Sequence, residues 1–85
     1  MQYTKKEIES FISEFFKKKD GVKVLKKIKN INLIESGLID SLDLVTLSLK
    51  LEIKFKIKVN PNSSLTLKKF SNFDTLIDYI YKKCK

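Results

Sequence analysis

An apolar stripe at helical spacing in the first eighteen residues constrains the fold more than any other feature of the sequence. It consists of Ile8, Phe11, Ile12, Phe15 and Phe16. Residues with this i, i+3, i+4, i+7, i+8 spacing lie along one side of an α-helix and need a core to cover them. The preceding Thr4-Lys5-Lys6-Glu7 has the residues of a capping box. We therefore expect a helix from there to about Lys18, stopped by Asp20-Gly21.

Two more helices are expected towards the C-terminus. Asn62-Ser63-Ser64 offers caps for a short helix through about Lys69, and Ser71, with Asp74 three residues later, is expected to cap the last helix. The last helix has its own apolar stripe, which consists of Phe73, Leu76, Ile77, Ile80 and Tyr81.

The middle of the chain fits two readings. From Leu47 to Val59 apolar and other residues alternate, as in a half-buried strand. The helical reading uses the series Leu44, Leu47, Leu51 and Phe55. A strand of this length would need a partner, and no other segment alternates convincingly. We therefore predict a helix over about 41–55 and an extended exit over 57–59.

A long connection, residues 20–40, separates the first two main helices. We expect Leu33 and Ile34 to hold it on the core, with a short helical turn within 23–29. With 85 residues, two glycines and one proline, the chain fits one small domain. The predicted fold is all-α: a small antiparallel bundle of three main helices plus one short helix, with a long first loop.

Absent residue types exclude several kinds of chemistry. The chain has no histidine and one cysteine, Cys84, which rules out the common zinc sites, nucleophile–histidine pairs and an internal disulfide. We predict no catalytic or metal site. No apolar run approaches the roughly 20 residues that span a bilayer, and the N-terminus lacks a secretory signal. A cytoplasmic monomer is the expectation.

Charge is distributed unevenly along the chain. The net charge is +8, and all 18 basic residues are lysine. Residues 31–49 contain no lysine and three acids, Glu35, Asp40 and Asp43. This stretch is the only net acidic one, and we interpret it as a recognition patch for a basic partner.

The acidic stretch contains a serine at a predicted helix start. In Gly37-Leu38-Ile39-Asp40-Ser41-Leu42 a glycine turn leads to Asp40, which can cap the helix, and to Ser41 in its first turn. Free backbone N–H groups and the helix dipole favour a negatively charged group there.

This run resembles the prosthetic-group attachment site of the acyl carrier proteins. The resemblance extends over nearly the whole chain, through the order of elements, the long first loop, Leu51–Phe55 and Phe73–Ile80. It implies one carrier domain over 1–85 with 4′-phosphopantetheine on Ser41, attached by a separate Mg²⁺-dependent phosphopantetheinyl transferase. The arm would carry an acyl or aminoacyl group as a thioester between activating and transferring enzymes. The protein itself would not be an enzyme.

The resemblance also implies roles for neighbouring residues. Asp40 would assist placement of the arm, and a partly buried Leu42 would anchor the helix start. The residues expected to dock partners are Asp43, Val45, Leu49 and Ile53. Those expected to point inward and line the space for an acyl chain are Leu47, Leu51 and Phe55.

The second main helix departs from the family in its charge. Fatty-acid carriers usually have an acidic second helix, whereas Lys50, Lys54 and Lys56 occupy its later turns here. Enzymes that grip an acidic helix should bind this one poorly. We expect a dedicated carrier in a specialised fatty-acid, polyketide or amino-acid-activating pathway.

Two other functions remain open from the sequence. The charge, with a pI near 9.6, would also suit a small nucleic-acid-binding protein. Against that reading, the lysines are dispersed, arginine is absent, and the aromatic residues lie on core stripes. The other alternative is an interaction scaffold of carrier type that is never modified.

Overall fold

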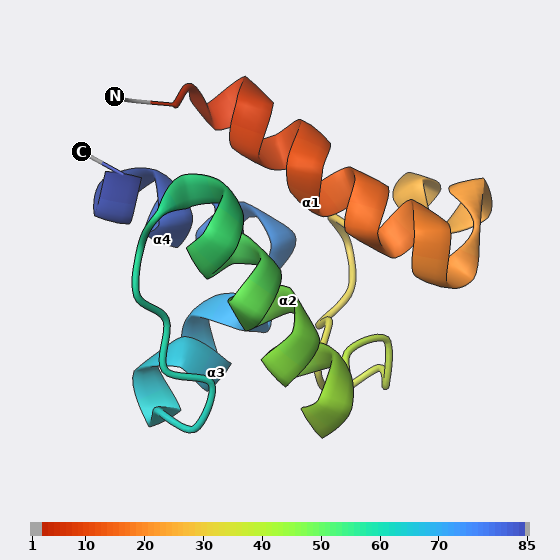
Figure 1. The fold of residues 1–85 in the computed structure, drawn as a ribbon. Coiled ribbons are helices and arrows are strands. Elements are labelled where there is room, and N and C mark those ends of the chain that lie inside the picture. The colour runs from red at the N-terminus through yellow and green to blue at the C-terminus, as the bar shows by residue number, and fades with distance from the viewer. Residues whose placement is uncertain (1–2, 85) are drawn as a thin grey trace.

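The computed structural model describes residues 3–84, a range that is helical and contains no strand (Figure 1). Its elements are α1 (Lys5–Asp20), the 3₁₀ helix η1 (Val22–Lys26), α2 (Ser41–Phe55), α3 (Ser64–Phe70) and α4 (Phe73–Cys84). The all-α prediction is confirmed. Residues 1, 2 and 85 of the predicted domain lie outside the described range. None of the described helices is long and apolar enough to cross a membrane.

Helix α1 begins as its sequence predicts and runs two residues further. The Glu7 N–H donates to Thr4 Oγ1 at 3.1 Å, and the Thr4 N–H donates to Glu7 Oε1 at 3.0 Å, which completes the capping box. Gly21 ends the helix with φ of 88°, a conformation that disfavours residues with a Cβ. The fully buried residues of the stripe are Ile8, Ile12 and Phe16.

Helix α2 settles the two readings of the middle segment in favour of the helix. It spans Ser41–Phe55, and Lys56, in the left-handed conformation at φ of 57°, ends it. Its core side consists of Leu44, Leu47, Ser48, Leu51 and Phe55. Residues two apart in a helix lie about 200° apart around its axis. The strand-like alternation therefore places apolar side chains on two opposite faces of α2.

The C-terminal helices confirm one predicted cap and correct another. Ser63 caps α3 by accepting the Leu65 N–H at 3.2 Å. Ser71 does not cap α4, because its Oγ donates to the Lys68 carbonyl at 2.6 Å and closes the end of α3. Asn72, directly before α4, accepts the Asp74 N–H at 2.9 Å instead.

The connection between α1 and α2 packs against the core through several side chains along its length. Its start forms η1, within which lies part of the predicted helical turn. The connection contributes four side chains to the core, Val24, Ile28, Leu33 and Ile39. The Leu33 N–H also donates to the Ser71 carbonyl at 2.7 Å, which ties the connection to the junction between α3 and α4. The expected anchoring by Leu33 is confirmed.

One apolar cluster joins all of these elements. In Figure 1, α1 and α2 run in roughly opposite directions. Ring contacts link the two helices, since Phe55 lies 5.4 Å from Phe11 and 4.7 Å from Tyr3 between ring centroids, edge to face in both cases. Helix α4 packs against both α1 and α3.

The two apolar faces of α2 should differ sharply in their sensitivity to truncation. Leu51 is fully buried, so Leu51→Ala should lower the free energy of unfolding by about 2–5 kcal/mol. Leu49 is 53% exposed, so Leu49→Ala should change it by less than about 0.5 kcal/mol. Urea denaturation followed by circular dichroism measures both. Equal losses would contradict the orientation of α2.

Candidate functional site

Ser41 is an exposed residue at the first position of α2. Asp40 caps the helix, with its Oδ1 accepting the Asp43 N–H at 2.8 Å. The Asp40 N–H donates in return to Asp43 Oδ2 at 3.3 Å. This reciprocal capping box confirms that Asp40 is the cap and fixes the backbone on both sides of the Ser41 hydroxyl.

Lys19 connects this helix start to two other segments. Its Nζ lies 3.3 Å from Asp43 Oδ2 in α2 and 3.0 Å from Asp20 Oδ2 in α1. It also donates to the Leu38 carbonyl in the connection at 2.7 Å. The sequence analysis missed this residue, because nothing in a lysine-rich helix end distinguishes Lys19 from Lys17 or Lys18.

The chain leading to Ser41 is held by hydrogen bonds within the connection itself. Asn32 Oδ1 accepts the N–H groups of Ile34 and Glu35 at 3.0 and 2.8 Å, which forms a turn. The Ile39 N–H then donates to the Leu33 carbonyl at 2.8 Å. Gly37 has φ of 83°, so a side chain there would be strained even though no atom lies within 4 Å of the position a Cβ would take.

The capping contacts set the charge state of the helix start. Hydrogen bonding from the Asp43 backbone is the largest influence on the Asp40 carboxyl, and with the nearby Lys19 charge it lowers the pKa of Asp40. Burial alone would lower the pKa of Lys19. Its hydrogen bonds to Asp20 and Asp43, together with their charges, outweigh this and raise that pKa. Both groups are therefore held ionised at neutral pH.

A pocket of about 560 Å³ opens beside Ser41. Its lining comes from the connection, α2, the segment before α3, and α3, and includes Ile34, Ile39, Leu44, Val45 and Leu67. The residues expected to line an acyl site, Leu47, Leu51 and Phe55, are buried as predicted. They do not line this pocket, whereas Leu44, on the same core side of α2, does.

An uncovered apolar stripe runs along α2 from the residue after Ser41. Its exposed fractions are 75% at Leu42, 40% at Val45, 53% at Leu49 and 78% at Ile53. The expectation that Leu42 is partly buried is wrong, because Leu42 lies about 200° around the helix from the core residue Leu44. Val45, Leu49 and Ile53, for which core packing was the competing interpretation, are accessible. We call Leu42, Val45, Leu49 and Ile53 the α2 stripe.

Asp43 does not belong to the α2 stripe. Its side chain is 22% exposed and faces Lys19 of α1. The position lies about 100° around the helix from Leu42. The structure thus separates Asp43 from the apolar docking candidates with which it was grouped.

No family model, curated protein or solved structure matches this chain. A function is therefore argued from the geometry around Ser41 and along α2. Within residues 3–84, no group of three or more His, Cys, Asp or Glu side chains is placed to hold a metal ion.

The Asp40 cap should make stability depend on pH in acid. Because folding lowers the pKa of Asp40 below its ordinary 3.8, the ionised carboxylate stabilises the fold above that value. This contribution should be lost as the pH falls through the lowered pKa. Asp40→Asn keeps a capping oxygen without the charge. Urea denaturation between about pH 5 and pH 2 should show the wild type losing its advantage over the variant. Parallel curves would contradict the prediction.

Proposed function

We propose that the protein is a carrier that is phosphopantetheinylated on Ser41 and conveys an acyl or aminoacyl group between enzymes. The observation that carries the proposal is an exposed serine hydroxyl at the first position of a capped helix, bordered by a pocket and by the α2 stripe. The proposal includes the antiparallel-bundle arrangement of the acyl carrier proteins that the sequence resembles.

The residues around Ser41 fit such a group. The hydroxyl is accessible, and the backbone before it is held by the Lys19 and Leu33 contacts. The Asp40 and Asp43 N–H groups already donate within the capping box, so a phosphate on Ser41 would gain from the helix dipole rather than from these two donors. The pocket offers apolar surface at the attachment point.

In the attachment reaction the protein would be the acceptor of the phosphopantetheinyl group, and the transferase would be the catalyst. The Ser41 oxygen would form a bond to the phosphorus that carries pantetheine in coenzyme A. The bond from this phosphorus to the phosphoadenosine part would break, and the serine proton would pass to a base of the transferase. The bound arm would supply the thiol that forms a thioester.

The α2 stripe is the surface we assign to partner enzymes. Four apolar side chains are uncovered along α2, starting directly after the modification site, where an incoming enzyme must approach. Exposed Lys50 and Lys54 lie in the later turns of the same helix, and exposed Lys56 ends it. Exposed Glu35 and Asp40 lie before its start. Cognate enzymes would therefore present acidic side chains to the lysines and basic ones to Glu35 and Asp40, which supports a dedicated carrier in a specialised pathway.

Intact mass spectrometry tests the modification. Incubation with coenzyme A, Mg²⁺ and a broad-specificity phosphopantetheinyl transferase should add one phosphopantetheinyl group to the wild type and none to Ser41→Ala. Ser64→Ala is the matched control and should be modified fully, because Ser64 is likewise an exposed first residue of a helix. A folded wild type that gains no mass, with its native transferase also tried, would favour an unmodified scaffold.

Acyl loading tests the choice of pathway. A housekeeping fatty-acid transacylase that grips an acidic helix should load the modified protein at least about 10-fold more slowly than its own carrier, because like charges would meet across the interface. Thioester formation can be followed by mass spectrometry. Equal loading rates would contradict a dedicated carrier while leaving the modification itself intact.

A further inference from the structure

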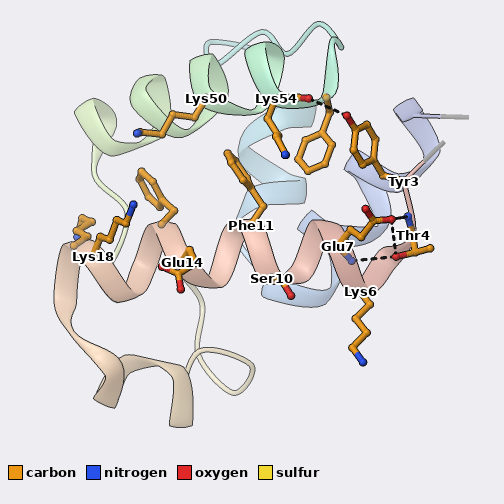
Figure 2. A pocket seen from close by; sticks show the side chains of 13 residues that line it. Tyr3, Thr4, Lys6, Glu7, Ser10, Phe11, Glu14, Lys18, Lys50 and Lys54 are labelled. Atoms are coloured by element: carbon orange, nitrogen blue, oxygen red, sulfur yellow. Dashed lines mark hydrogen bonds between the residues drawn. The ribbon is translucent and has the colours of Figure 1, made fainter. Parts of the chain in front are cut away.

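A groove of about 870 Å³ runs between α1 and α2 (Figure 2). Its lining extends from Tyr3 and Thr4, which precede α1, along α1 to Lys18 and Lys19, and on α2 it includes Lys50, Lys54 and Phe55. It shares no lining residue with the pocket beside Ser41. The groove is therefore a second accessible feature for which attachment of an arm gives no role.

The floor of the groove is aromatic. Tyr3, Phe11 and Phe15 are half-buried there, and Phe55 lies beneath with 5% exposure. Figure 2 shows Phe11 pointing from α1 towards α2, between the two rows of polar side chains. Tyr3 and Phe11 both contact the Phe55 ring edge to face, so the floor is a continuous apolar surface held in place by the core.

The rims of the groove carry uncompensated positive charge. Five lysines and two glutamates line it. Four of these lysines, Lys6, Lys18, Lys50 and Lys54, form no ion pair with any residue in 3–84. Both glutamates are engaged on α1 itself, since Glu7 completes the capping box and Glu14 lies 3.9 Å from Lys17.

We propose that this groove binds an acidic amphipathic helix of a partner protein. The lining on α1 extends over fourteen residues from Lys6 to Lys19, which corresponds to about 21 Å of helix. A partner helix of four to five turns would place its apolar side on Phe11 and Phe15. Its acidic residues would then meet lysines on both rims, as in other helix-in-groove complexes.

The distribution of the lysines argues against a single-headed amphiphile such as a fatty acid. One carboxylate would pair with one ammonium group and leave the others unmatched, whereas the cations extend from Lys54, near Tyr3 at one end of the groove, to Lys18 near the other. An occupant with acidic groups along its whole length matches this arrangement better.

The same groove is less suited to single-stranded nucleic acid. Stacking of bases needs accessible ring faces, and Phe55, which contacts Tyr3 and Phe11, is nearly covered. Phosphates would also meet the carboxylates of Glu7 and Glu14 within the lining. An amphipathic helix can place small or basic residues opposite these two positions.

Nuclear magnetic resonance with a designed peptide tests the proposal. The probe is a helical peptide of about 18 residues with leucine on one face and glutamate on the other, titrated into ¹⁵N-labelled protein. We expect saturable shifts of the Phe11, Phe15 and Lys50 amides and none at Leu42 or Val45. A peptide of identical composition, scrambled so that no apolar face forms, is the ligand control.

Charge reversal tests whether peptide binding depends on the lysines of the groove or only on the net charge of the protein. The double variant Lys50→Glu/Lys54→Glu should weaken peptide binding at least about 10-fold. The matched control, Lys58→Glu/Lys68→Glu, changes the net charge equally at exposed lysines outside the groove and should bind within about 2-fold of wild type. Circular dichroism confirms that both variants keep their helices.

Three results would overturn the proposal. They are equal weakening by the two double variants, shifts confined to the α2 stripe, and no saturable shift at millimolar peptide. Groove shifts produced by an oligothymidylate or by anionic phospholipid vesicles, but not by the peptide, would reassign the groove to those ligands. Ser41→Ala should bind the peptide as wild type does, so failure of the carrier proposal leaves this test unaffected.

Discussion

The small size of the domain limits how much of the apolar surface of α2 can be buried. An 85-residue chain builds one core, and the apolar residues of α2 alternate so that they emerge on two opposite faces of the helix. Only one of these faces can be buried. Leu47 and Leu51 pack against the rest of the core, and Leu49 and Ile53 are consequently left in solvent. The alternation of apolar residues, which is typical of a strand, here belongs to a helix with one apolar side in the core and another in solvent.

Local interactions are the part of this fold that could be predicted. The Thr4–Glu7 capping box, the α1 stripe and the Asp40 cap all join residues within two turns of one another, and their spacing is visible in the sequence. The predicted Ser71 cap was wrong because Ser71 and Asn72 are both residue types that cap helices. Only the start of α4 at Phe73 shows which of the two is the cap. The exposure of Leu42 follows from the same helical spacing, because Leu42 lies about 200° around the helix from Leu44 of the core series. Its expected partial burial came from the family resemblance instead.

The interactions that position the candidate sites join distant parts of the chain. Lys19 contacts Leu38 and Asp43, and Phe55 contacts Tyr3 and Phe11. Neither set has a sequence signature, because one lysine or phenylalanine among many carries no information about its partner. The groove between α1 and α2 follows from these contacts and could not be predicted from the sequence, although two of its lysines, Lys50 and Lys54, had been noted as a departure from the family.

The uncovered α2 stripe could promote self-association, and the net charge of the protein opposes it. Two copies that met through Leu49 and Ile53 would bury apolar surface and adhere to each other. A net charge of +8 on a chain of this size makes such encounters repulsive and opposes self-association. The same charge attracts molecules of opposite sign. The abundance of lysine therefore disfavours contact between identical copies more than contact with an acidic molecule.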